Sequence, residues 1–310
     1  MAANCRPLLV VHDAEEGHLV YDLRFCNEEA LELRPFPRPV VQPLHYRPLV
    51  VSGGTILGTP PSREFQDNAA GSPIMVAVGD SMVIRMDTNI HSSSTFEMLR
   101  LVPGKSWHTV PLPRPPIGIT SSPSEKVSIC SYFVMGTRVW ICVPGKGTFS
   151  LDTDNATWRL EFAVLLPFEG RAFFVPELGA VIGLAERNET LCAFELTENG
   201  FQDWRVTDWN SHPTLKDCVD ADHMPFSDEM VSLAYLGNGR FCVCRGIKVR
   251  MERGDWRRPT WYMASSLLVM EVARLRGGPF DGELDVVNSG GATYHGMWPD
   301  GQCRDLYLIT

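Results

Sequence analysis

Residues 212–223 hold the densest group of side chains in the sequence that could bind a metal or move a proton. Two histidines, three aspartates and one cysteine lie within this segment. Carboxylate oxygens and imidazole nitrogens can together bind a divalent cation, and His223 beside Asp222 could act as a general base with its orienting group. A solvated acidic loop has the same composition, and we favour that interpretation, so we predict no metal site.

Motifs of the common enzyme classes are absent from the sequence. It contains no G-x-S-x-G, no H-E-x-x-H and no C-x-x-C, which mark hydrolase nucleophiles, zinc proteases and paired-cysteine sites. Cys242 and Cys244 alternate along a strand-like run, so both thiols face the same side of a sheet. Packing in a core explains these two cysteines better than metal binding does. We therefore expect neither a metal nor a cofactor.

The overall charge disfavours nucleic acid as a partner. The sequence has 28 Lys and Arg against 37 Asp and Glu, a net charge of -9, whereas affinity for nucleic acid comes from neutralising phosphates. No stretch approaches the ~18 apolar residues that cross a bilayer, and the first residues lack the order of a secretory signal. We expect a cytoplasmic protein, with the nucleus as the alternative, that binds neither nucleic acid nor membrane.

The elements that would position functional side chains are short β-strands. The 26 glycines and 23 prolines indicate many turns, and no long window combines helical periodicity with a cap at each end. Runs rich in β-branched and aromatic residues, bounded by turn residues, predict strands. Examples are residues 8–11, 19–23, 75–78, 82–86, 131–135, 139–143, 191–196 and 241–244.

An internal repeat decides the fold class. Four hairpins share one form, in which an apolar strand, a turn with a glycine and a second apolar strand follow one another; the turn glycines are Gly79, Gly136, Gly179 and Gly237. After each of the first three hairpins comes a third strand and then a fourth that opens on a tryptophan, at Trp107, Trp158 and Trp204. Four strands per unit, with units about 40 to 60 residues apart, are typical of β-propeller blades.

We therefore predict an all-β protein with a single β-propeller domain, 1–310, of five or six four-stranded blades. The predicted blades are 6–36 together with 304–310, then 72–113, 127–166, 171–207 and 229–290. Segment 37–71, with its own predicted hairpin, is an insertion or a partial blade. The first blade has three strands of its own, the third at Ala30–Leu33. We expect the C-terminal strand, within 304–310, to pair with this blade and close the ring.

Two blocks of sequence resemble a known family. Residues 145–158, GKGTFSLDTDNATW, and residues 166–179, LPFEGRAFFVPELG, resemble the kelch-like, F-box-associated β-propeller proteins of grasses, most of them uncharacterised. Phe96–Leu99 and Trp107–Pro113 fit the same pattern, and the resemblance covers about residues 70 to 250. It implies an intracellular plant propeller without an F-box segment, and it carries no established chemistry with it.

The predicted topology gathers ionisable side chains at one end of the propeller. Connections between blades, and between the second and third strands of each blade, reach the face where propellers usually bind ligands. The candidate ligand-binding residues there are His12, Asp13, Asp87, His91, Arg187, His223 and Arg250, with Arg171 and Glu177 bordering the central channel. We favour a non-enzymatic module whose loops bind an unidentified protein or small molecule. The alternative is a lyase, isomerase or hydrolase with an acid/base site at the channel mouth.

A basic and aromatic patch stands out within this acidic chain. Trp256, Arg258 and Trp261 lie in a long loop of the last blade, and Arg and Trp are enriched at interface hot spots. The patch is a candidate site for a protein or sugar partner. Folding down over the channel as a cap is the other interpretation of the same residues.

Overall fold

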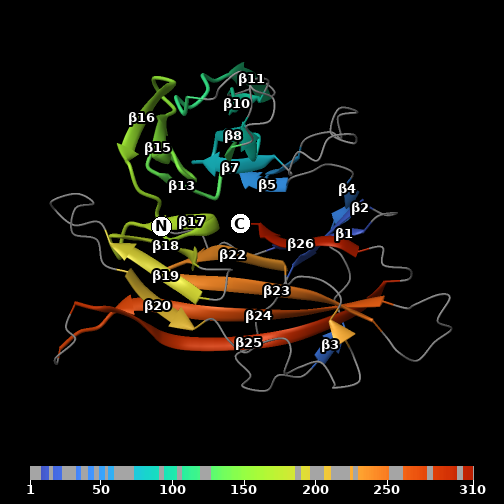
Figure 1. Cartoon of the computed structure of the whole chain (residues 1–310). Coiled ribbons are helices and arrows are strands. Elements are labelled where there is room, and N and C mark those ends of the chain that lie inside the picture. Colours follow the sequence, from blue (N-terminus) through green and yellow to red (C-terminus); the bar gives the residue numbers. More distant parts are fainter. Residues whose placement is uncertain are drawn as a thin grey trace. The chain divides into compact units, whose positions relative to one another are not determined.

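The computed structural model describes the backbone of most strands and their tight turns (Figure 1). The described backbone comprises residues 8–13, 17–22, 33–35, 41–44, 49–52, 55–58, 73–90, 94–102, 107–118, 127–185, 190–195, 206–210, 224–225, 230–250, 261–277, 282–298 and 303–309. Side chains are described within 73–90, 94–102, 107–118, 127–185, 190–195, 231–246, 267–277 and 282–289. Every regular element in these ranges is a β-strand, and none of the described residues forms a helix long and apolar enough to cross a membrane.

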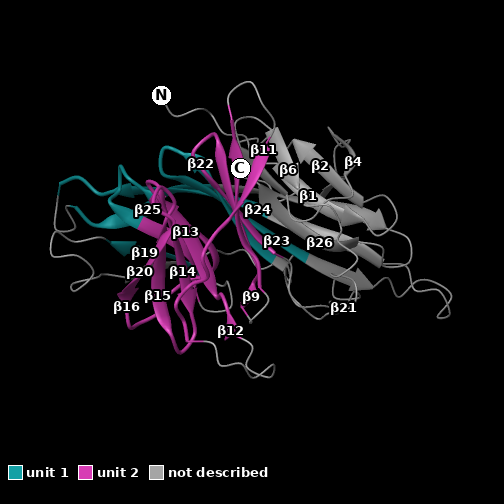
Figure 2. Ribbon diagram, turned by 90° about the horizontal axis from the view of Figure 1, so that it is seen from above, with its two compact units in different colours: residues 1–45, 175–180, 188–310 teal, residues 46–174, 181–187 magenta. Residues whose placement is uncertain are grey.

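The chain divides into two compact units (Figure 2). Unit 1 contains residues 1–45, 175–180 and 188–310, and unit 2 contains residues 46–174 and 181–187. Each unit is built from antiparallel sheets. The single propeller domain with its blade boundaries stays a prediction.

The first sheet of unit 2 is an antiparallel meander. Its strands are β7 (Ile74–Val78), β8 (Met82–Met86), β10 (Phe96–Leu101) and β11 (Trp107–Pro111), in the order β11-β10-β8-β7. The short strands β9 (Asn89–Ile90) and β12 (Val127–Ser128) pair with each other, and β5 (Leu49–Ser52) forms a hairpin with β6 (Thr55–Gly58). The four-stranded sheet is the one that the sequence predicts within 72–113.

The second sheet of unit 2 repeats this meander. It contains β13 (Ser131–Met135), β14 (Arg138–Val143), β15 (Gly147–Asp152) and β16 (Thr157–Phe162), each antiparallel to the next. On its other side β13 runs parallel to β17 (Glu169–Val175), which is followed by β18 (Ala180–Ala185). Two meanders of the same form along the chain are what a repeat predicts.

The core of unit 2 lies between these two sheets. Alternate residues of β7, β8 and β10, such as Val76, Ile84 and Phe96, pack in one buried cluster with Ile141 and Phe149 of the second sheet. Trp158 joins both sides. Its indole lies edge-on to Phe96, with ring centroids 6.1 Å apart, and its Nε1–H donates a hydrogen bond to the Pro113 carbonyl, 2.7 Å away. The tryptophan near the start of a fourth strand therefore fills the space between neighbouring sheets, as the repeat predicts.

The main sheet of unit 1 consists of long antiparallel strands. These are β22 (Met230–Gly237), β23 (Arg240–Arg250), β24 (Trp261–Arg274) and β25 (Leu284–Trp298), which lie side by side in Figure 1. The short strand β21 (Met224–Pro225) pairs with β23. The same unit contains the antiparallel pair β19 (Thr190–Glu195) and β20 (Val206–Asn210).

The N-terminal strands and the last strand share a sheet of unit 1. Its order is β26-β1-β2-β4, where β26 is Cys303–Ile309, β1 is Leu8–Asp13, β2 is Gly17–Asp22 and β4 is Val41–Leu44. The antiparallel pairing of β26 with β1 is present as predicted; closure of a ring stays a prediction.

The third strand of this sheet differs from the prediction. We expected Ala30–Leu33, but β4 pairs with β2, and β3 (Leu33–Pro35) runs parallel to β25 instead. β4 contains Pro43, which lacks an N–H group, and its position at the sheet edge tolerates that residue.

The repeated turn glycines have the backbone that the hairpins need. Gly79, Gly136, Gly179 and Gly237 have φ values of 62°, 62°, 61° and 85°. This left-handed region costs glycine little and other residues more. All four glycines therefore have the turn backbone that the sequence predicts. The turns differ in length, since two residues separate β13 from β14 and four separate β17 from β18; their equivalence in a repeat stays a prediction.

Candidate functional site

Three of the predicted ligand-binding residues have described side chains: Asp87, Arg171 and Glu177. Only the backbone is described for three other ligand-binding candidates and for Trp261 of the basic and aromatic patch. His12 and Asp13 lie in β1, Arg250 ends β23 and Trp261 begins β24. The remaining candidates, His91, Arg187, His223, Trp256 and Arg258, lie outside the described residues. The predicted clustering around a channel mouth stays a prediction.

The Asp87 carboxylate accepts hydrogen bonds from Thr95, eight residues further along the chain. The backbone N–H of Thr95 donates a hydrogen bond to Asp87 Oδ2, 2.7 Å away, and the Thr95 hydroxyl lies 3.4 and 3.3 Å from the two carboxylate oxygens. These bonds fix the connection between β8 and β10. Asp87 therefore holds a loop, and its carboxylate is already occupied by the protein.

Glu177 lines an open recess in unit 1. The recess has a volume of about 740 Å³. Its walls are the turn between β17 and β18, the turn between β22 and β23, and the end of β24 with the chain that follows; the lining residues are Glu177, Leu178, Asn238, Gly239, Glu271, Val272, Ala273, Arg274, Leu275, Arg276 and Gly282. The sequence predicts Glu177 at the border of a central channel, which stays a prediction, and it did not identify the other residues that line this recess.

Arg274 ties three segments together at this recess. Its Nη2 lies 3.0 Å from Glu195 Oε2 on β19 and donates a hydrogen bond to the Leu178 carbonyl. Its Nη1 donates to the Gly282 carbonyl, 2.7 Å away. One guanidinium thus fixes the positions of two turns and a strand, so the shape of the recess depends on a single side chain.

Tyr235 and Glu177 form a second polar contact at the recess. The Tyr235 hydroxyl donates a hydrogen bond to Glu177 Oε1 and accepts one from the Gly239 N–H, 3.4 Å away. Burial and the bond to Glu177 raise the pKa of Tyr235 to about 12, so the phenol stays neutral at physiological pH. This pair could not be predicted from the sequence, because the two residues come from separate hairpins.

Arg171 lies near the start of β17; its place on an innermost strand beside a central channel stays a prediction. It is the register partner of Tyr132 in the parallel pair β13 and β17, and its guanidinium carbon lies 4.6 Å from the ring centroid of Phe173. Tyr132 and Phe173 were not among the predicted site residues. The described side chains therefore place Arg171 in an aromatic setting.

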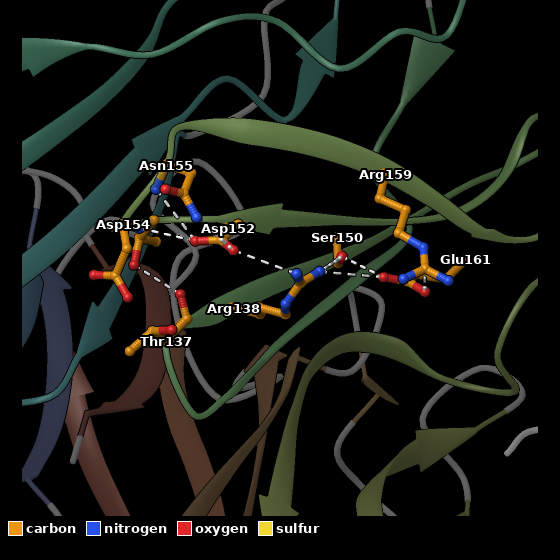
Figure 3. Close-up of polar contacts among 9 residues, drawn as sticks. Thr137, Arg138, Ser150, Asp152, Asp154, Asn155, Arg159 and Glu161 are labelled. Carbon is orange, nitrogen blue, oxygen red and sulfur yellow. Dashed lines mark hydrogen bonds and ion pairs between the residues drawn. The ribbon is translucent and has the colours of Figure 1, made fainter.

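A polar network covers one face of the second sheet of unit 2 (Figure 3). Arg138 Nη1 donates to Ser150 Oγ at 3.0 Å, and Ser150 Oγ donates to Glu161 Oε1 at 2.6 Å. Arg138 Nη2 lies 3.3 Å from Asp152 Oδ2, and Arg159 Nε lies 3.5 Å from Glu161 Oε2. Arg138 of β14 thus meets carboxylates on β15 and β16, whereas Arg159 meets Glu161 on its own strand. Opposite charges on neighbouring strands stabilise a sheet.

Asp152 also organises the turn after β15. Its carboxylate accepts hydrogen bonds from the backbone N–H groups of Asn155, at 3.2 Å, and Asp154, at 3.0 Å. The bond from Asn155 is the main cause of an Asp152 pKa below its usual value. The carboxylate is therefore ionised and committed to the turn, which favours a structural role for the whole network.

Metal ligation finds no support in the part of the chain with described side chains. Those residues contain no group of three or more His, Cys, Asp or Glu that could hold a metal; segment 212–223 lies outside them. Cys242 and Cys244 are both fully buried, and burial raises the pKa of each thiol. Their predicted place in the core is confirmed.

The described residues define an all-β protein built from several antiparallel sheets. The chain belongs to the family described as a protein of unknown function (DUF1668), whose model matches residues 51–294.

Solved structures similar to this chain include two from other organisms. One is a protein from Lactobacillus plantarum, 10% identical with a TM-score of 0.44, and the similarity covers 98% of this chain and 99% of that one. Another is the β-propeller domain of Cps50 (Swd1) from Myceliophteria thermophila, 12% identical with a TM-score of 0.31, over 77% of this chain and 87% of that one. No curated protein matches the sequence.

Proposed function

We propose that the chain folds as a β-propeller of five or six blades and acts as a non-enzymatic binding module. Support comes from the repeated meanders of unit 2, the tryptophan packed between them, and the parallel contact of β13 with β17. Radial repetition of four-stranded sheets produces such contacts, because the first strands of successive blades meet around an axis.

The recess beside Arg274 is the observation on which the binding proposal rests. It has the size of a small-molecule or short-peptide site, about 740 Å³. Its charged wall is fixed by hydrogen bonds before any ligand arrives, since Glu177 accepts from Tyr235 and Arg274 pairs with Glu195. A pre-formed site lowers the entropy cost of binding.

Glu271 and Arg276 are the charged lining residues left to meet a ligand. Neither forms an ion pair with another described residue, and Arg276 is exposed while Glu271 is half-buried. A ligand that carries both a cationic and an anionic or hydrogen-bonding group complements this pair. Such groups occur on protein segments and on small molecules, the two partner classes predicted from the sequence.

Charge reversal at the recess tests the proposal. Arg276→Glu is compared with Arg100→Glu, a matched reversal at an exposed position of β10 in unit 2. Ligands are found with a small-molecule thermal-shift library and by affinity capture on the full chain. We expect the Kd of a recovered ligand to rise about tenfold or more in Arg276→Glu, because a charged hydrogen bond is lost, and to stay unchanged in Arg100→Glu.

If Arg276→Glu and Arg100→Glu bind the ligand with equal affinity, the binding site lies elsewhere and the proposal that the recess binds it is refuted. Mass spectrometry of the recovered ligand, before and after incubation, separates binding from catalysis. A chemically changed ligand would favour the lyase, isomerase or hydrolase alternative, which stays a prediction. The kelch-like character, the plant source and the cytoplasmic location also stay predictions.

A further inference from the structure

Arg171 occupies an unusual position for a cation. It is half-buried on β17, beside Tyr132 of β13 in the parallel register Tyr132↔Arg171. Register partners on adjacent strands project from the same face, and Phe173, two residues along, does so as well. The Arg171 guanidinium lies over the Phe173 ring, with 4.6 Å from the ring centroid to Arg171 Cζ. This cation–π contact involves no carboxylate or carbonyl acceptor, so the guanidinium N–H donors are left for other acceptors.

These donors lack a partner within the described part of the chain. Four other arginines with described side chains form ion pairs with carboxylates: Arg85 with Glu97, Arg138 with Asp152 and Glu161, Arg159 with Glu161, and Arg274 with Glu195. The neighbours of Arg171 are instead aromatic, a phenol and a phenyl ring. A half-buried cation is usually paired, because burial penalises an isolated charge.

The electrostatics of the two side chains agree with this geometry. Burial lowers the pKa of Arg171, and only the nearby Tyr132 opposes that effect. Burial likewise raises the pKa of Tyr132. Both groups are thus poorly solvated, and the favourable charge that would compensate the guanidinium is missing from its described surroundings.

We propose that Arg171, with Tyr132 beside it, is an anion-binding site for the carboxylate or phosphate group of a small molecule. The planar guanidinium donates two parallel N–H bonds to such an oxyanion, a geometry that lysine cannot reproduce. The Tyr132 hydroxyl is a neutral donor on the neighbouring strand, and the Phe173 ring provides a cation–π contact to the guanidinium. This site belongs to unit 2 and is independent of the recess in unit 1.

Thermal unfolding of the full chain in the presence of simple anions tests the site. The chain is titrated with sodium phosphate and, separately, with sodium acetate, against sodium chloride at constant ionic strength. An anion that binds only the folded state stabilises it by RT ln(1 + c/Kd), where c is the anion concentration, so the melting temperature rises with the logarithm of that concentration once it exceeds the Kd. We expect this rise in the wild type. In Arg171→Gln we expect the apparent Kd to rise about tenfold or more, because the charged hydrogen bonds are lost.

A matched control and a second variant complete the experiment. Arg159→Gln removes an arginine that is 71% exposed, and it should bind both anions as the wild type does. Arg171→Lys keeps the charge without the planar fork, and should bind more weakly than the wild type. If Arg171→Gln does not fold, Arg171→Lys decides: affinity equal to that of the wild type overturns the proposal.

The two anions distinguish the chemical sources. Stabilisation by phosphate alone identifies a phosphate site, by acetate alone a carboxylate site, and by both a general oxyanion site; each supports the proposal when it follows this logarithmic form and is reduced in Arg171→Gln. No stabilisation by either anion relative to chloride overturns it, as does an unchanged response in Arg171→Gln. A negative result with Arg276→Glu at the recess would not affect this test, because the two sites share no residue.

Discussion

Arg274→Ala should lower the free energy of unfolding by more than the loss of an exposed ion pair would. The guanidinium is 35% exposed and its partner Glu195 is 17% exposed. Truncation leaves a mostly buried carboxylate unpaired and frees the carbonyls of Leu178 and Gly282. An exposed pair is worth about 0–1 kcal/mol, whereas breaking a buried pair costs about 3–5 kcal/mol. Discounted for solvent screening at the exposed guanidinium, the Glu195 pair contributes about 1.5 kcal/mol.

The two carbonyls add less than fully buried acceptors would. Leu178 and Gly282 both line the recess, so water can replace the guanidinium, and each bond is worth about 0.5 kcal/mol. The free energy of unfolding should therefore fall by about 2.5 kcal/mol in Arg274→Ala. Urea denaturation followed by tryptophan fluorescence measures this loss.

A double-mutant cycle isolates the ion pair from the carbonyl contacts. Glu195→Gln alone, and combined with Arg274→Ala, gives the coupling energy of the pair, which we expect to be about 1–1.5 kcal/mol. A loss below about 0.5 kcal/mol in Arg274→Ala, or zero coupling to Glu195, would refute the idea that this guanidinium holds the recess together.

Two further predictions test other parts of the molecule. Gly147→Ala should lower the free energy of unfolding by about 3 kcal/mol, because φ is 111° and a Cβ would lie 2.3 Å from the Phe162 carbonyl oxygen. The control Gly136→Ala, with φ of 62° and no atom within 4 Å, should cost only about 1 kcal/mol; equal losses in urea denaturation would contradict the geometry. Tyr235→Phe should lose most stability below about pH 10, where the phenol is neutral in both the folded and the unfolded chain and its bond to Glu177 is intact. Because the pKa of Tyr235 is raised to about 12, that contribution is lost as pH rises from about 10 through 12. The difference in stability from the wild type should therefore shrink between about pH 10 and pH 12, and a constant difference would argue against the shift.

Local features of the fold could be predicted from the sequence. Strand positions and the turns at Gly79 and Gly136 follow from apolar runs and from a backbone that favours glycine, and both are properties of a few adjacent residues. The packing place of Trp158 followed from its position in the repeat. The exchange of Ala30–Leu33 for Val41–Leu44 could not be foreseen, because a short strand of either segment satisfies the same pattern.

The functional side chains were predictable only one at a time. Arg171 and Glu177 were singled out because the sequence predicts a strand and its turn there, but their partners come from distant parts of the chain. Tyr235 is 58 residues from Glu177 and Arg274 is 96 residues from Leu178. Spacing along a sequence carries no information about such contacts when the blades that meet are unknown. The contact of the Asp87 carboxylate with the Thr95 N–H was likewise not predicted, because an acidic residue in a loop does not indicate which backbone group it will bind.

The pairing of β26 with β1 has a consequence for synthesis. β1 is made early, and its partner emerges from the ribosome only after the intervening chain has been translated. Until then β1 is an unprotected edge, with the sequence Leu-Leu-Val-Val, of the kind that pairs with other chains and aggregates. Loop closure over so long a segment adds little to the equilibrium cost, since that cost grows with the logarithm of length. The vulnerable period is therefore kinetic, and chaperone binding to the nascent chain would be most important before its last strand appears.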